Sequence, residues 1–225
     1  MLDFRSEGEV AVITMDDGKA NAVSHSFIDN LNQGLDRAEA ESRAVVLQGR
    51  SGVFSAGFDL KEIGKGPAES KALVDKGASL LLRLFSFPMP VVAASAGHAI
   101  AAGALLMLAS DTRFGASGEA KYGLNETAIG MSLPPFGLQI ALCRVSKRHQ
   151  TQAIIQAKLY GVEEAQRVGF LDEVVNAQEL EKAAITRARE LAELPTKAYA
   201  AIKLDVRRHY IDIIEASLSL SLIHI

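Results

Sequence analysis

One carboxylate, Glu126, lies downstream of two turns that are built from small residues. The first turn is Ser55-Ala56-Gly57, and the second is Ala101-Ala102-Gly103. Backbone N–H groups at the start of a helix are unpaired and partly positive, so two converging turns of this kind would bind one substrate oxygen. A carboxylate facing that oxygen can move a proton on the carbon beside a carbonyl. The three features predict proton transfer, although each turn alone also fits a plain joint between a strand and a helix.

The elements that must hold these turns are visible as local patterns. Ala44–Gln48 and Val91–Ser95 are short apolar runs, as expected of buried strands that lead towards the two turns. Gly57 permits an unusual φ and lets the backbone approach a ligand closely. Asp59 precedes a short helix near Leu60, and an N-cap is favoured for it over a role as a second acid.

Strands alternate with helices through the first two thirds of the chain, which predicts an α/β core with parallel strands over residues 1–175. A helical region over residues 176–225 then covers this core or forms a subunit contact. Further predicted strands are Val10–Met15, Thr112–Ala116 and Leu171–Val175. Predicted helices cover residues 24–40, 69–85, 103–109, 139–144, 147–157, 162–168, 177–192 and 196–210, with a loop over 49–58.

Composition excludes several classes of protein. The 225 residues suffice for one sizeable core, and a net charge of −3 argues against a nucleic acid partner. The single cysteine, Cys143, rules out an internal disulfide, and the five scattered histidines make no metal site. The longest apolar run, Ala99–Ala109, is too short to span a bilayer. No targeting segment is evident, so the expected location is the cytoplasm, with an organelle left open.

The ordered motifs resemble the crotonase, or enoyl-CoA hydratase/isomerase, superfamily. The resemblance rests on Phe54–Leu60 and Gly97–Gly103, whose turns are about 46 residues apart, together with Lys19-Ala20-Asn21-Ala22 and Gly161–Val175. It implies ββα units wound into a spiral core, with C-terminal helices at a trimer interface. It also implies acyl-CoA thioesters as substrates, with coenzyme A as part of the substrate and no separate cofactor or metal. The expected assembly is a homotrimer or a dimer of trimers.

The resemblance also assigns roles to residues. The N–H groups of Ala56 and Ala102 match the two oxyanion donors. Of the two glutamates that serve the family's hydratases, the first would fall at Leu105 and is absent, and the second falls at Glu126. Gly123-Leu124-Asn125-Glu126-Thr127 is similar to the mitochondrial-type Δ3,Δ2-enoyl-CoA isomerases. Glu126 is therefore expected to take a proton from C2 of a 3-enoyl-CoA and return it to C4, while Leu105 keeps the pocket dry.

The remaining substrate contacts are expected around the two turns. By family analogy the backbone near Ser55 holds the adenine side of CoA, and Lys61 either approaches a phosphate or is solvated. His98 either lines the pocket or caps a strand end. The full set of expected substrate-binding residues is Ser55, Gly57, Phe58, Asp59, Leu60, Lys61, His98 and Leu105. Lys203, Arg207 and Arg208 are further candidates for a phosphate.

Three alternatives and one anomaly stay open. The chain can be a hydratase or another crotonase that uses Glu126 alone, or a non-catalytic acyl-CoA-binding protein. An RNA-associated relative is disfavoured because the helix over residues 24–40 carries only Arg37. Serine and leucine alternate near the C-terminus with a period of two, unlike the preceding helices. We expect a truncated or non-native end there, which would open the acyl site and weaken trimer formation.

Overall fold

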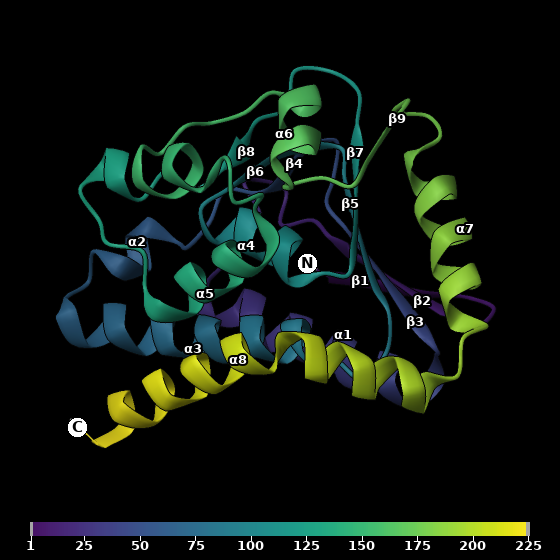
Figure 1. Ribbon diagram of the computed structural model, residues 1–225, viewed down its shortest axis with the longest axis horizontal. Coiled ribbons are helices and arrows are strands. Elements are labelled where there is room, and N and C mark those ends of the chain that lie inside the picture. The colour runs from purple at the N-terminus through teal and green to yellow at the C-terminus, as the bar shows by residue number, and fades with distance from the viewer. Residues whose placement is uncertain (1, 224–225) are drawn as a thin grey trace.

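Four ββα units follow one another in a computed structural model that describes residues 2–223 (Figure 1). The first unit is β1 (Leu2–Glu7), β2 (Val10–Met15) and α1 (His25–Glu41). The second is β3 (Ala44–Gln48), β4 (Gly52–Ser55), α2 (Leu60–Ile63) and α3 (Pro67–Phe85). The third is β5 (Val91–Ser95), β6 (Gly97–Ile100) and α4 (Ala102–Ala109), and the fourth is β7 (Thr112–Ala116), β8 (Tyr122–Gly123) and α5 (Pro135–Arg144). This order confirms the predicted spiral of ββα units.

The rest of the chain is mainly helical. A 3₁₀ turn, Thr127–Ile129, lies between β8 and α5, and a π-helical turn, Thr151–Ile155, follows α5 in place of the helix predicted over 147–157. The remaining elements are α6 (Val162–Val168), β9 (Glu173–Val175), α7 (Leu180–Ala192) and α8 (Thr196–Ile223). No helix within residues 2–223 has both the length and the apolar character needed to cross a membrane.

A six-stranded sheet with the order β1-β2-β3-β5-β7-β9 forms the larger layer, and every pair except β1–β2 is parallel. Val12 and Val46 pack on one face with Ala184 and Ala188 of α7, which covers that side of the sheet in Figure 1. The opposite face packs against the core formed with α1, α3 and α4. The central strands β2, β3 and β5 are buried on both faces and read as continuous apolar runs, which made them predictable.

A second sheet has the order β4-β6-β8, and the sequence predicted none of its three strands; β1 of the larger sheet was also not among the predicted strands. All three strands are parallel, with Gly52 beside Gly97 and Ala99 beside Tyr122. The prediction of a loop over residues 49–58 is therefore wrong for β4. These strands are two to four residues long and rich in glycine and alanine, so they carry no alternating pattern. Neighbouring backbone, rather than side-chain propensity, stabilises them.

Two buried cations tie α8 to the spiral core. Lys203 Nζ lies 2.6 Å from Asp111 Oδ2 and also donates hydrogen bonds to the carbonyls of Phe87 and Met89. Arg207 lies 2.9 Å from the other Asp111 oxygen and donates to the Phe85 carbonyl at the end of α3. Burial lowers the pKa of Lys203 to about 8, against the opposing effect of Asp111.

These contacts correct the prediction that the C-terminal cations bind a phosphate. Lys203 and Arg207 are buried and already paired within the fold. Arg208 is exposed and pairs with Asp205 at 2.9 Å. None of the three side chains lines the cavities described below beside Glu126 and Lys61.

The serine-rich segment near the C-terminus continues α8 beyond the predicted end at Tyr210. Ser217 Oγ donates to the Ile214 carbonyl, and Ser219 Oγ donates to the Glu215 carbonyl. Such hydrogen bonds let serine satisfy its hydroxyl on a helix, which explains why the alternation did not predict the observed structure. Residues 224 and 225 lie outside the described residues.

Substitution of Asp111 tests this anchor. We expect Asp111→Ala to lower the free energy of unfolding by about 3–5 kcal/mol, because it leaves two buried cations without their counter-charge. Asp205→Ala is the matched control, since it removes an exposed ion pair worth at most about 1 kcal/mol. Urea denaturation measures both values. Equal losses in the two variants would contradict the assigned role of Asp111.

Candidate active site

The three strands of the small sheet end at one cavity of about 140 Å³. Strand β4 leads into the first turn, β6 leads into the second, and β8 leads to Glu126. Because the strands are parallel, their carboxyl ends lie together, with a shift in the register of β4 against β6 between Val53 and Ser55. The lining residues are Ala56, Phe58, Leu60, Ile63, Val74, Ala101, Leu105, Asn125, Glu126, Ile129, Met131, Ser132, Pro134 and Phe136.

The two turns touch each other through their glycines. A β-carbon at Gly103 would overlap the carbonyl oxygen of Ser55, and a β-carbon at Gly57 would lie 2.9 Å from the β-carbon of Ala101. Gly57 also has a φ of +93°, which residues with a side chain rarely adopt. Glycine is therefore required at both positions for the turns to converge, as the sequence predicted.

The amide of Ala102 is available to a ligand. Ala102 is the first residue of α4, where N–H groups have no partner within the helix, and no acceptor for it is found among residues 2–223. The preceding Ala101 has φ +52° and ψ −124°, a strained conformation for a residue with a side chain. Its N–H donates to the Gly123 carbonyl at 2.9 Å, which joins the second turn to the strand that carries Glu126.

The amide of Ala56 is not available, which argues against its predicted role as an oxyanion donor. It donates to the Ala20 carbonyl at 3.0 Å. Phe58, two residues later, offers the better candidate. The Val23 amide donates to the Gly57 carbonyl, and the Val23 carbonyl accepts from the Asp59 amide. These two hydrogen bonds flank Phe58, so the Phe58 N–H points away from Val23. No acceptor for the Phe58 amide is found within the described part of the chain, and Phe58 lines the cavity.

Glu126 is half-buried and has no hydrogen-bond partner for one carboxylate oxygen. Its Oε2 is shielded from solvent, and no group of residues 2–223 bonds to it. Burial raises the pKa of this carboxyl above its usual range, since desolvation penalises the charged form. The Glu126 carbonyl accepts from the amides of Ile129 and Met131, which fixes the backbone beside the cavity.

The wall beside Glu126 is otherwise apolar or uncharged. Leu105, at the position where a second acid would be needed, is 1% exposed and lines the same cavity. Glu126 is the only acidic side chain among the described lining residues. A carboxylate with a raised pKa in such surroundings is suited to accept a proton and to release it again.

Asn21 has a structural role that its sequence motif did not predict, and Ser55 supports the first turn instead of contacting the substrate. Ser55 is buried, and its Oγ donates to the Asn21 carbonyl and accepts from the Gly57 amide. The Asn21 side chain donates to the carbonyls of Met15 and Phe54. Both residues therefore brace the first turn from behind rather than line the cavity. A buried asparagine with a φ of +49° is the signal, and it is visible only in the structure.

His98 caps a strand end, the second of the two roles expected for it, and does not line the pocket. Its side chain is exposed, and Nδ1 accepts a hydrogen bond from the Lys121 amide at 3.0 Å. It does not line the cavity that contains Glu126. The histidine thus supports the edge of the small sheet.

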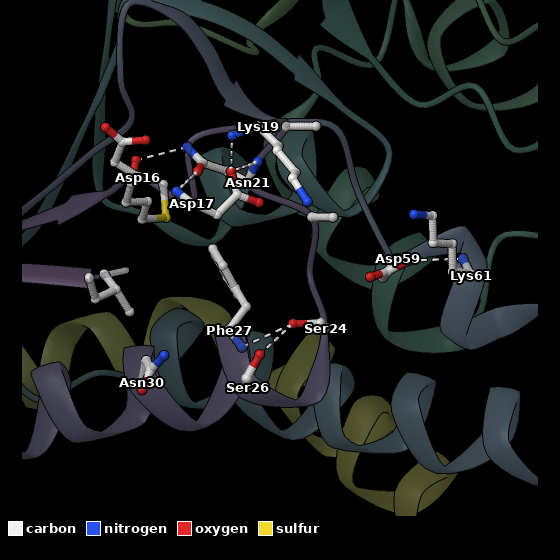
Figure 2. Close-up of a pocket in the computed structure, with 14 residues that line it drawn as sticks. Asp16, Asp17, Lys19, Asn21, Ser24, Ser26, Phe27, Asn30, Asp59 and Lys61 are labelled. Atoms are coloured by element: carbon white, nitrogen blue, oxygen red, sulfur yellow. Dashed lines mark hydrogen bonds between the residues drawn. The ribbon is translucent and has the colours of Figure 1, made fainter.

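A second cavity of about 370 Å³ lies on the other side of the first turn. Figure 2 shows the loop residues Asp16, Asp17 and Lys19 above α1, with Asp59 and Lys61 farther along. Asp59 accepts from the Lys61 amide, which confirms the predicted helix cap. Side chains alternate along this segment: Phe58 and Leu60 line the first cavity, while Asp59 and Lys61 line the second.

Comparisons with known proteins agree with this geometry. The sequence model described as enoyl-CoA hydratase/isomerase matches residues 5–221. A probable enoyl-CoA hydratase of Bacillus subtilis (strain 168) is 37% identical over 131 residues, which cover 56% of this chain and only half of that protein's length. The human mitochondrial enoyl-CoA delta isomerase 1 is 32% identical over 88% of this chain and 68% of its own length.

Solved structures extend the similarity to the whole fold. The apo structure of an enoyl-CoA isomerase from Mycobacterium tuberculosis superposes with a TM-score of 0.94 and is 36% identical. The match covers 100% of this chain and 98% of the other.

Gly103→Ala tests the contact between the turns. We expect a loss of about 1–3 kcal/mol or more in the free energy of unfolding, because the new methyl group overlaps the Ser55 carbonyl. Gly161→Ala is the control, because a β-carbon there would approach only Lys121 Nζ, at 4.0 Å. Thermal or urea denaturation compares the two. A Gly103 variant as stable as the Gly161 variant would refute the close approach.

Glu126→Gln tests the cost of burying this charge. The pKa of Glu126 is raised in the folded chain, so its ionisation opposes folding above that pKa. We expect the glutamine variant to be more stable than the wild type at pH 7. The difference should disappear as the pH falls below the ordinary value of 4.5, where both chains are neutral at this position. A variant that is less stable at pH 7 would show that the carboxylate has a stabilising partner.

Proposed function

Because the chain belongs to the enoyl-CoA hydratase/isomerase family, we propose that it moves a double bond of an enoyl-CoA from the 3,4 to the 2,3 position. The observation that carries this proposal is the lone Glu126 carboxylate in an otherwise uncharged cavity beside two free amides. The similarity to the human isomerase supports the same reaction, whereas the mycobacterial protein is named an isomerase in one structure and a probable enoyl-CoA hydratase in another.

In the proposed mechanism the thioester oxygen accepts hydrogen bonds from the amides of Ala102 and Phe58. Glu126 takes the proton from C2, and the electron pair of the broken C–H bond forms a dienolate whose negative charge rests on that oxygen. The neutral Glu126 carboxyl then returns the proton to C4. The carbonyl re-forms, and the double bond lies between C2 and C3. Each amide donor contributes on the order of 3–4 kcal/mol of transition-state stabilisation.

Burial suits Glu126 to both halves of this cycle. A raised pKa makes the carboxylate a stronger base and keeps the protonated form accessible after the first step. Leu105 and Phe136, both buried beside the cavity, exclude water that would otherwise compete for the dienolate or exchange the proton.

The second cavity is suited to the nucleotide end of coenzyme A. Lys19 and Lys61 line it together with the carboxylates of Asp16, Asp17 and Asp59, and the two ammonium groups are the candidate partners for a phosphate. In this arrangement the pantetheine arm crosses the first turn, with the adenosine phosphate on the Lys61 side and the thioester on the Phe58 side.

Hydration of a 2-enoyl-CoA by Glu126 alone is the second candidate, and the name of the Bacillus relative favours it. Water addition needs one group that activates the water and one group that donates a proton to C2. Among the described residues that line the cavity, Glu126 is the single acid available for both steps. The two reactions differ in substrate, so an assay separates them.

We propose that the chain assembles as a homotrimer or a dimer of trimers. Ile202 and Val206 of α8 are exposed large apolar residues, and together with Leu194 they line a third cavity of about 410 Å³. Light scattering is expected to give a mass of three or six chains. Val206→Glu should lower that mass, and a monomer of the unchanged protein would contradict the assembly.

The decisive assay compares 3-enoyl-CoA and 2-enoyl-CoA with wild type and Glu126→Gln. We expect wild type to isomerise the first and to add no water to the second. The glutamine variant should lose about 10²–10⁴-fold or more in kcat while still binding acyl-CoA, because only proton transfer is removed. Hydration of 2-enoyl-CoA without isomerisation supports the second candidate, and binding with neither reaction supports a non-catalytic protein.

A further inference from the structure

A glycine lies in the interior of α3, where alanine or leucine would favour the helix. Gly77 is a buried residue of the 19-residue helix Pro67–Phe85, and it is far from both caps, Gly66 and Ser86. Glycine inside a helix is less favourable than alanine, because it loses more backbone freedom on folding. Since Gly77 neither starts nor ends the helix, we looked for its role in what packs against it.

The ring of Phe58 occupies the space that a side chain at position 77 would need. A β-carbon added at Gly77 would lie 2.6 Å from Cζ of Phe58 and nearer still to Cε1, well inside van der Waals contact. The half-buried ring therefore lies directly on the backbone of α3. The helix that begins two residues after Phe58, α2, also packs on α3 (Figure 1).

Phe58 is held on two sides, and its amide lies between them. The Val23 amide donates to the Gly57 carbonyl, and the Asp59 amide donates to the Val23 carbonyl, so hydrogen bonds fix the main chain on one side. The contact of the ring with Gly77 fixes the other side. Neither contact uses the N–H of Phe58, which stays free for a ligand.

We propose that Gly77 is a positioning residue for the oxyanion donor, because the space that it leaves on α3 receives the Phe58 ring and so directs the Phe58 amide at the thioester oxygen. This inference rests on the proposed function, which assigns that amide to the thioester. A methyl group at position 77 forces the ring either to push its own main chain, which moves the amide, or to turn into the cavity beside Glu126. In both cases the thioester oxygen loses a well-aligned donor.

The size of the effect follows from what one donor contributes. Removal of an oxyanion donor typically lowers kcat about 10²–10³-fold. A displaced donor loses part of this contribution, so we expect Gly77→Ala to lower kcat at least about tenfold. The dissociation constant of the acyl-CoA should change less than about threefold, because such a donor acts mainly on the transition state.

Four variants test the contact, each by steady-state kinetics with 3-enoyl-CoA and by urea denaturation. Gly77→Ala adds the methyl group. Phe58→Leu removes the ring atoms that meet it and keeps the amide, and the double variant combines the two changes. Gly34→Ala is the matched control, because Gly34 also lies inside a helix, α1, where the nearest atom to a new β-carbon is the flexible end of Ile13, at 3.2 Å.

We expect Phe58→Leu to lower kcat about threefold, because the amide is then held on one side only. The double variant should match it, and should be at least about threefold more active than Gly77→Ala, since the shorter side chain avoids the methyl group. Gly34→Ala should keep kcat within about twofold of wild type. A wild-type kcat in Gly77→Ala would overturn the inference, as would a double variant no more active than Gly77→Ala. Should Gly77→Ala not fold, the spectrum of Phe58→Leu decides.

Infrared spectroscopy separates the inference from the proposed reaction. Hydrogen bonds to a thioester carbonyl lower its stretching frequency, and butanoyl-CoA labelled with ¹³C at that carbonyl cannot isomerise. We expect the frequency of the bound ligand to be lowered in wild type and Gly34→Ala, and to be lowered less in Gly77→Ala and Phe58→Leu. The same frequency in wild type and Phe58→Leu, or a wild-type frequency equal to that of the free ligand, would contradict the positioning role.

The outcomes are distinguishable from those of the proposed function. The expected pattern of frequencies in a protein that does not isomerise 3-enoyl-CoA would keep the role of Gly77 and refute the isomerase. Isomerase activity with one frequency in wild type and all variants would keep the reaction and refute the role of Gly77.

Discussion

The parallel register of β4, β6 and β8 is the constraint on which the rest of the structure depends. Each strand is too short to be stable alone, yet together they deliver two turns and one carboxylate to the same point. The register leaves no room for side chains where the turns meet, so Gly57 and Gly103 are fixed by contact with the opposite turn. The larger sheet and its helices hold this small sheet in place, and α4 also supplies the Ala102 amide.

The glycines stabilise the contact between the turns, whereas the charged form of Glu126 destabilises the folded protein. The fold gives its Oε2 no partner and surrounds it with apolar walls, which disfavours the charged form of the folded protein. Ala101, strained beside it, is a second local cost. Such costs persist at sites where chemistry needs them, whereas at the buried Asp111 anchor both carboxylate oxygens are paired with a cation.

Sequence reasoning worked where burial leaves a pattern. The strands Ala44–Gln48 and Val91–Ser95 were predicted at their observed bounds because parallel strands buried on both faces are continuously apolar. It failed for β4, β6 and β8, whose stability comes from neighbours far along the chain. The sequence also could not show that the Ala56 amide is unavailable as an oxyanion donor. Only the hydrogen bonds of the first turn to Ala20 and Val23 reveal which amide is free. Lys203 and Arg207 were expected as candidates for a phosphate, and only the structure shows their burial against Asp111.

The central claim is that one buried carboxylate carries the same proton from C2 to C4. The most direct measurement follows 3-enoyl-CoA deuterated at C2 through a single turnover in ordinary water, with NMR of the product. The account predicts that a measurable fraction of the deuterium appears at C4, because Glu126 holds it in a site that excludes water. A product that carries only solvent hydrogen at C4 would contradict a single-carboxylate shuttle.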